Sequence, residues 1–355
     1  MRDISQKFSR MDSLKMNMKQ INTGRNFRRK QFSNSDETIK RIAIPTNEFS
    51  GEAAVAVLLI KWLPEYREYE VFRTDDPEIY QECSFKLCFA ENYNHSERYY
   101  PRKTTLAIPG YPEKVSTGGL IFHHYGERAI ASRFQVKGTE DTDNFRYLMK
   151  RLYQCIIFPI DTFEELDPKK NNENRIDSDI VRLSKMLDPS DDPDPYIKQY
   201  YFASLMNLIE EQFAQRVIWI TKNFIPSRVS MKRAMEERKK VYPTGEIVLV
   251  QHYVPILQCR DIIDPDESRK QSVKYIIMAR PTGDAIVHVL NWRSNCKRLK
   301  YAGKSGEQLT GVLQNISGSG WVHSNGALAE WNSIPNALEY AKQVLKSQPD
   351  KQGPQ

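Results

Sequence analysis

The sequence predicts an α/β protein in which a mostly parallel sheet is flanked by helices, with a smaller C-terminal α+β domain. Three observations support this prediction. The chain has 355 residues, which is enough for two compact domains. Apolar residues make up 40% of it and charged residues 27%, the balance of a globular protein. Strand-like and helix-like segments alternate through the first half, an order typical of parallel sheets covered by helices.

The elements of the first half follow from the pattern of apolar residues. Short apolar segments between turn residues predict strands, and longer periodic segments predict helices. The expected strands lie at 41–44, 70–73 and 85–89. The expected helices lie at 51–63, where Pro64 ends the helix, and at 77–82, 118–125 and 142–158. Together these elements predict an α/β domain over residues 41–190.

The second half begins after a loop at 188–195, whose sequence DPSDDPDP is rich in turn formers. A long amphipathic helix is expected at 196–224 and a final helix at 335–345. Between them the expected strands lie at 246–250, 272–279 and 285–290, with a hairpin turn at 281–284. They predict a helical connector and an α+β domain over 196–345. A polar tail at 346–355 follows.

The net charge of +7 lies entirely in the N-terminal segment. Residues 1–30 hold nine Lys or Arg, with Asp3 and Asp12 as their acids, and the rest of the chain is neutral. A basic segment over 1–40 predicts a targeting sequence for mitochondria, with the matrix side as the expected location, or an arm that lies along a partner. No apolar run approaches the roughly 20 residues of a membrane span, so no transmembrane segment is expected.

The cysteines predict neither a disulfide framework nor a structural zinc site. They are odd in number and include no CxxC pair, which is typical of a reducing compartment. They are Cys83, Cys88, Cys155, Cys259 and Cys296.

Several short strings follow one another in a fixed order along the body of the chain. They are LPEYR at 63–67, RTDDP at 73–77, STGGLI at 116–121, HYG at 124–126, EQFAQR at 211–216, PTGEIV at 243–248 and WVH at 321–323. In this order the chain resembles the Myg-type exonuclease family, a branch of the DHH phosphoesterase superfamily. The resemblance covers about residues 41 to 345 and implies a DHH-phosphoesterase-like fold for the domain at 41–190.

The resemblance also implies which positions would hold two metal ions. Two-metal phosphoesterases bind their cations through carboxylates and imidazoles. The four family motifs fall here on 45–52, 88–90, 101–103 and 161–166. Glu52 and Asp161 are the two carboxylates left among the degenerate positions, which are Pro45, Ser50, Glu52, Cys88, Pro101, Arg102, Lys103 and Asp161. The sequence therefore predicts no catalytic residue, no metal ligand and no cofactor.

From this loss we expect a catalytically inactive, exonuclease-like protein that is not an enzyme. Its expected role is that of a structural accessory subunit of a large mitochondrial assembly, either a respiratory-chain complex or the mitoribosome. Its partners would be protein subunits of that complex, and RNA is a further candidate partner. One alternative is a divergent metal-dependent 3′–5′ exonuclease on RNA or DNA, rebuilt around Glu52 and Asp161. Another is a non-cleaving RNA-binding protein.

Basic and imidazole side chains supply the candidate phosphate or RNA contacts. Arg102 and Lys103 would contact phosphates in the place of metal. His323 follows a Trp in the C-terminal domain, and the basic segment around Tyr301 adds further cations. The candidate contacts are Arg102, Lys103, His323, Arg298 and Lys300. His123 and His124 are expected to be packed or surface-exposed.

Overall fold

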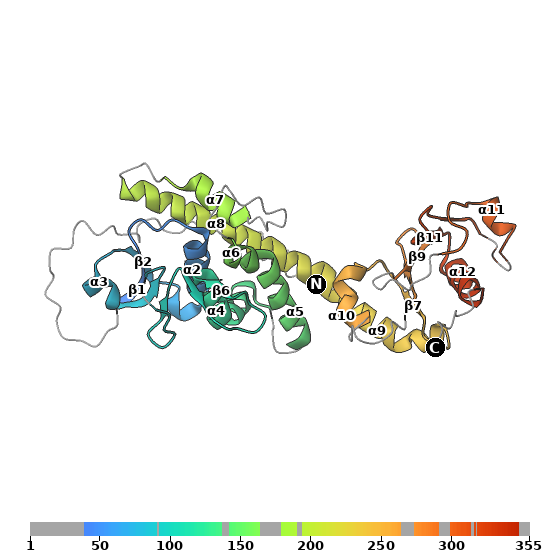
Figure 1. The fold of residues 1–355 in the computed structure, drawn as a ribbon, viewed down its shortest axis with the longest axis horizontal. Helices are drawn as coiled ribbons and strands as arrows, with labels where there is room; N and C mark the ends of the chain where they lie inside the picture. The colour runs from blue at the N-terminus through green and yellow to red at the C-terminus, as the bar shows by residue number, and fades with distance from the viewer. Residues whose placement is uncertain are drawn as a thin grey trace. The chain divides into compact units, whose positions relative to one another are not determined.

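The computed structural model forms two compact units, with the division between Ile218 and Trp219 (Figure 1). It describes residues 39–90, 92–136, 142–163, 179–189, 194–263, 273–290, 299–313, 316 and 318–347. Most of the predicted N-terminal arm at 1–40, and most of the tail at 346–355, lie outside these residues. The division falls within a long helical segment rather than at 188–195, because the first part of that segment packs on unit 1. Phe202 and Phe213 there contact Phe49 and Trp62 edge to face.

Unit 1 is built on a parallel four-stranded sheet. The strands are β1 (Ile39–Ile44), β2 (Glu70–Arg73), β3 (Cys83–Leu87) and β4 (Tyr99–Tyr100), in the order β2-β1-β3-β4. Ile42 lies opposite Val71 on one side and Phe85 on the other. A separate antiparallel pair, β5 (Lys103–Thr105) and β6 (Lys114–Ser116), follows the sheet. The predicted α/β class, with a parallel sheet flanked by helices, is confirmed.

Helix α2 (Gly51–Lys61) lies at the centre of unit 1, next to α4 (Thr117–Phe134). Nearly every residue of α2 is buried, as expected of a helix that is apolar all round. Its close contact with α4 depends on Gly118, where a Cβ atom would lie 3.2 Å from the carbonyl oxygen of Glu52. The other helical segments of unit 1 are η4 (Pro64–Tyr66), α3 (Pro77–Gln81), α5 (Thr142–Leu152), η5 (Tyr153–Ile157), α6 (Phe158–Asp161), α7 (Asp179–Leu187) and α8 (Pro195–Trp219).

Unit 2 contains a five-stranded sheet of a different kind. The order is β10-β11-β9-β8-β7, and only the β7–β8 pair is parallel among its described strands. The strands are β7 (Ile247–Val250), β8 (Tyr275–Ala279), β9 (Ala285–Val289), β10 (Gly320–Val322) and β11 (Leu328–Trp331). The helical segments are η6 (Ile220–Phe224), α9 (Ile225–Val241), η7 (Ile256–Cys259), α10 (Arg260–Ile263), α11 (Glu307–Thr310) and α12 (Ile334–Lys346). Tyr275, Trp331 and Tyr340 form the buried centre of one of its cores.

The element boundaries differ from the sequence prediction in a few places with clear physical causes. The strand expected at 85–89 lies two residues earlier, because Cys88 has a φ of 66° and leaves the extended conformation. The segment 196–224 is helical, and the chain continues into α9, which was not predicted. No described helix is long and apolar enough to cross a membrane.

Candidate functional site

The predicted site positions meet where parallel strands of unit 1 end and two helices begin. Strand β1 ends at Ile44, and a turn leads from it to α2. Strand β3 ends just before Cys88, and β4 ends just before Pro101. Ser50 and Ser116 are the N-cap residues of α2 and α4. In open α/β sheets this edge, outside the carboxyl ends of the strands, is where ligands bind.

The turn between β1 and α2 carries a buried acid, Glu48. Its side chain is 2% exposed, and its Oε2 atom pairs with Arg102 Nη2. Arg73 Nη1 donates to the backbone oxygen of Glu48 at 2.5 Å and fixes the turn. Glu48 Oε1 is buried and has no hydrogen-bond partner among the described residues. Sequence reasoning missed Glu48, since nothing in a polar turn signals that one acid is buried.

Asp161 is the second buried acid, at the end of α6. Its Oδ1 atom accepts hydrogen bonds from Ser116 N at 3.0 Å and Ser116 Oγ at 2.6 Å, and its Oδ2 atom accepts one from the Tyr153 hydroxyl at 3.0 Å. Gly119 allows this approach, because a Cβ there would lie 2.4 Å from Asp161 Oδ1. Burial raises the pKa of Asp161, although the Ser116 and Tyr153 hydrogen bonds act in the opposite direction.

Glu52 is the third acid, and it lies in the first turn of α2. Burial raises its pKa from 4.5 to about 7, although the charges of Lys103 and Arg102 lower it. The charges of Glu48 and Asp161 raise it further, so all five groups lie close enough to influence one another. Glu52 is therefore ionised in about half of the molecules at pH 7.

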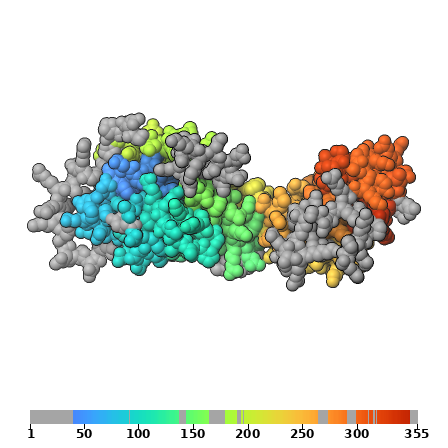
Figure 2. All heavy atoms as spheres, in the orientation of Figure 1, coloured from blue at the N-terminus to red at the C-terminus, as the bar shows by residue number. Residues whose placement is uncertain are grey.

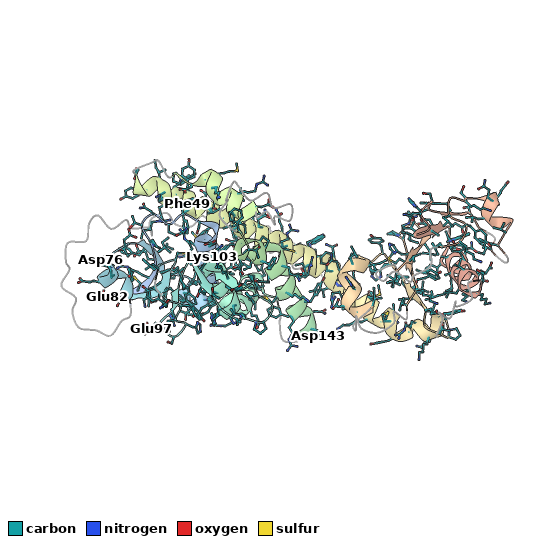
Figure 3. The ribbon with its side chains drawn as sticks, viewed as in Figure 1. Phe49, Asp76, Glu82, Glu97, Lys103 and Asp143 are labelled. Atoms are coloured by element: carbon teal, nitrogen blue, oxygen red, sulfur yellow. The ribbon has the colours of Figure 1, made fainter. Side chains whose placement is uncertain are left out.

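The two cations of the site are held differently. Lys103 Nζ donates to the backbone oxygen of Phe163 at 2.6 Å, and Figure 3 shows Lys103 among the side chains in the middle of unit 1. The side chain of Arg102 is 53% exposed, although one of its terminal nitrogens pairs with Glu48. Its other donors can therefore reach a ligand from solvent.

These residues do not fit the two-metal centre that the family resemblance implies. Glu48 is already paired with Arg102, and Asp161 already accepts three hydrogen bonds. No imidazole is among the groups that influence Glu52, and two cations stand beside the acids, where they would repel a metal ion. Across the part of the chain that the structure describes, no group of three or more His, Cys, Asp or Glu side chains is arranged to hold a metal ion. The arrangement instead suits an anion held by Arg102 and Lys103 beside a weakly acidic carboxyl group.

The remaining predicted positions of unit 1 have structural contacts. The Ser50 hydroxyl accepts a hydrogen bond from Ala53 N at 3.2 Å. The Cys88 thiol is buried, donates to Thr117 Oγ1 at 3.3 Å, and has a pKa that burial raises well above 9.0. The backbone oxygen of Pro101 accepts from Thr117 Oγ1 at 2.6 Å. Pro45 ends β1, and its oxygen accepts from Glu48 N at 3.0 Å.

The candidate phosphate contacts of the C-terminal half lie in unit 2. His323 is exposed, accepts a hydrogen bond from Asn325 N at 3.3 Å, and has its ring 5.8 Å from that of Trp321. Lys300 Nζ donates to the backbone oxygen of Ser347 at 3.0 Å. This hydrogen bond links the Lys300 side chain to the end of α12. Arg298 lies outside the described residues.

Comparison with known proteins gives one family for nearly the whole body of the chain. A family model for MYG1 exonucleases, described as "Uncharacterised protein family (UPF0160)", matches residues 41–345. The chain belongs to the MYG1 exonuclease family. The MYG1 exonuclease of Bos taurus is 25% identical over 334 residues, which cover 87% of this chain and 85% of the relative. The MYG1 exonuclease of Homo sapiens is 25% identical over 337 residues, covering 86% and 85%. The MYG1 protein of Dictyostelium discoideum is 24% identical over 330 residues, covering 87% and 97%.

This finding corrects one expectation drawn from the sequence. The loss of metal ligands led us to expect a protein that is not an enzyme, whereas its MYG1 relatives from Bos taurus, Homo sapiens and Mus musculus are named exonucleases. The expectation treated the metal ligands as the only route to chemistry at this site. A carboxyl group with a raised pKa beside two cations is a different arrangement, and only the folded chain brings these groups together.

Proposed function

We propose that this member of the MYG1 exonuclease family hydrolyses phosphodiester bonds of nucleic acid at the unit 1 site, with Arg102 and Lys103 in the place of metal ions. The observation that carries the proposal is Glu52, whose pKa is about 7 beside these two cations. The names of the relatives support the substrate class. We further propose that unit 1 has a DHH-phosphoesterase-like fold and that unit 2 is the smaller C-terminal α+β domain.

In the proposed reaction the two cations hold the phosphate and Glu52 acts as general base. Arg102 offers the guanidinium donors that Glu48 leaves free, and Lys103 supplies a second positive charge against the phosphate oxygens. Glu52 accepts a proton from a water molecule as the water oxygen bonds to phosphorus. The phosphorus–oxygen bond to the leaving nucleotide breaks, and the departing oxygen takes its proton from solvent. The two cations stabilise the charge that builds up on the phosphate.

The test is nucleotide release from end-labelled single-stranded RNA and DNA by the purified full chain, with EDTA and with Mn²⁺. We expect hydrolysis in EDTA that falls about 10²- to 10⁴-fold in Glu52→Gln, the range for loss of a general base. Glu78→Gln is the matched control, because Glu78 is exposed in the first turn of α3. No hydrolysis in either buffer, or hydrolysis that Glu52→Gln leaves intact, would overturn the proposal.

A second role is favoured by exposed apolar side chains of unit 1. Met186 on α7 is 81% exposed, and Tyr196 and Tyr200 on α8 are 66% and 56% exposed. Tyr196 and Tyr200 are four positions apart and lie on one face of α8, and exposed apolar residues that lie together are typical of protein–protein contact sites. They support the proposal that the chain is also a subunit of a large mitochondrial assembly.

The test of this second role is fractionation of native mitochondrial complexes. Co-migration with a respiratory complex or the mitoribosome is expected, and recovery outside mitochondria or only as a free chain would contradict it.

A further inference from the structure

Five aromatic and imidazole rings gather beside the site of unit 1, on one side of α4. They come from the segment before β4, from the β5–β6 region and from α4 itself. We call this set the ring surface: Tyr93, His95, Tyr111, His123 and His124. From its geometry we propose that the ring surface is a nucleobase-binding subsite that stacks the base next to the bound phosphate. This inference rests on the proposed function, since the phosphate is the one placed at Arg102 and Lys103.

The ring surface is continuous with the site through a short series of contacts. The Tyr153 hydroxyl donates to Asp161, and the Tyr153 ring lies 4.2 Å from that of Tyr111. The Tyr111 ring in turn meets His123 edge to face at 5.4 Å. Along α4, Gly119 touches Asp161, and His123 follows four residues later, a rise of about 6 Å. A rise of this size is within the reach of one nucleotide, and the proposal places the base and its phosphate about this far apart.

The rings are accessible and held in fixed positions. His95 and His123 are exposed, and the other three rings are half-buried. The Tyr93 hydroxyl and His124 Nε2 share a hydrogen bond of 2.6 Å, and His95 Nδ1 and the Tyr100 hydroxyl share one of 2.7 Å. The rings of His95 and His124 are stacked at 3.7 Å with an angle of 15°. In Figure 2 the teal part of the chain, which carries β4, β5 and α4, forms much of the visible surface of unit 1.

The electrostatics of the ring surface suit a flat neutral ligand. Burial, with the charge of His95, lowers the pKa of His124 to about 4 and also lowers that of His123. These two rings are therefore uncharged at pH 7 and offer π-faces rather than positive charges. A metal ion is disfavoured because one nitrogen of His95 and one of His124 are already hydrogen-bonded, and stacked rings do not direct their remaining nitrogens at one point.

A nucleobase fits this surface better than other flat groups because of what lies next to it. The neighbouring cations select a ligand with a phosphate, and the rings select a planar group attached to that phosphate. Stacking of a base on an aromatic ring contributes about 1–3 kcal/mol and tolerates every base, because each has a π-face. The subsite therefore predicts binding that depends on the presence of a base and little on its identity.

The test compares a single-stranded RNA oligonucleotide with an abasic oligonucleotide of the same length, both with hydrolysis-resistant phosphorothioate linkages, using fluorescence anisotropy with the full chain in EDTA. We expect the wild-type chain to bind the base-bearing oligonucleotide about tenfold more tightly. His123→Ala and Tyr111→Leu should remove this advantage and leave abasic binding unchanged. The matched controls are His252→Ala and Tyr253→Leu, two exposed residues of unit 2. Neither control should alter the advantage.

The outcomes separate this inference from the proposed function. Lys103→Met should weaken both oligonucleotides equally, because it removes a phosphate contact and no ring. Equal binding of the two oligonucleotides by the wild-type chain overturns the subsite and leaves the phosphate site standing. An advantage that survives both His123→Ala and Tyr111→Leu also overturns it. Binding of neither oligonucleotide overturns the proposed function, and the subsite with it.

Discussion

Each unit contains an ion pair with one buried member, and the two pairs are built in opposite ways. In unit 2 the arginine is buried: Arg228 is 7% exposed, and both oxygens of Asp261 accept from it at 2.7 Å. In unit 1 the acid is buried: Glu48 is 2% exposed, and one of its oxygens pairs with Arg102. The exposed member is the acid in unit 2, where the Asp261 side chain is 63% exposed, and the cation in unit 1, where the Arg102 side chain is 53% exposed. The first pair is bidentate and joins α9 to α10, while the second leaves donors of its cation facing outward.

The difference distinguishes a pair that supports the fold from one that supports a site. Arg228 also donates to the backbone oxygen of Gln258 at 2.9 Å, so its guanidinium is used within the protein. Glu48 Oε1, by contrast, has no partner within the described part of the chain. A buried carboxylate oxygen without a hydrogen bond lowers stability, and such groups are typical of places where function limits the packing.

The largest expected effect is on stability and follows from which member is buried. Arg102→Ala leaves the buried Glu48 carboxylate without its ion-pair partner, and the nearby Arg73 donates to the Glu48 backbone oxygen, so we expect a loss of about 3 kcal/mol in the free energy of unfolding of unit 1. Arg228→Ala leaves Asp261 in contact with water, so we expect a loss of about 1 to 2 kcal/mol in unit 2. Amide hydrogen exchange, read separately in each unit, measures both losses.

A double variant tests the cause of the Arg102 effect. Because the cost arises from an unpaired buried charge, Arg102→Ala with Glu48→Gln should recover at least half of the loss. If Arg228→Ala destabilises its unit as much as Arg102→Ala does, the comparison of the two pairs fails.

The next effect concerns the pH dependence of unit 1. The pKa of Glu52 is about 7 in the folded protein and 4.5 ordinarily, so folding favours its protonated form. Its contribution to stability is therefore present at low pH and is lost as the pH rises from about 4.5 to about 7. Glu52→Gln should stabilise unit 1 by about 3 kcal/mol at pH 8 and by almost nothing at pH 4.

This prediction is measured by hydrogen exchange of unit 1 across that pH range. Unit 2 provides an internal reference, because it contains no part of the site. Glu78→Gln is the control for loss of an exposed acid and should give no pH-dependent gain. A stabilisation by Glu52→Gln that is the same at pH 4 and pH 8 would show that the Glu52 carboxyl is not perturbed by burial.

The two units also differ in how many of their structural elements could be predicted from the sequence. In unit 1 the alternation of strands and helices was visible, and the motif positions implied by the family resemblance located Glu52, Arg102, Lys103 and Asp161. In unit 2 the sequence predicted β7, β8, β9 and α12, but β10 and β11 were missed. Their short segments, 320–322 and 328–331, carry little apolar alternation. Strand pairing at this length is decided by neighbouring strands rather than by local pattern.

The parts of the site that were missed depend on burial and on contacts between distant segments. Glu48 lies beside the exposed Thr46 and Asn47 in a polar turn, so its burial has no local signal. The ring surface joins Tyr93 and His95 to His124, about thirty positions away, through a hydrogen bond and a stacking contact. His123 and His124 were expected to be packed or exposed. The structure shows His123 exposed and His124 half-buried. It also shows that both belong to the ring surface, where His123 contacts Tyr111 and His124 stacks on His95.

The smallest effect compares two serines that begin helices, one in each unit. Ser333 caps α12 by accepting a hydrogen bond from Asn336 N at 3.4 Å. Ser116 caps α4 by accepting from Gly119 N at 3.1 Å, and its hydroxyl also donates to Asp161 at 2.6 Å. We expect Ser333→Ala to cost about 1 kcal/mol and Ser116→Ala about 2 to 3 kcal/mol, because the latter also loses a hydrogen bond to a buried carboxyl group. Ser116→Ala should in addition raise the pKa of Asp161, since that hydrogen bond lowers it. Hydrogen exchange of each unit gives the two losses, and equal losses would mean that the Ser116 hydroxyl contributes only a helix cap.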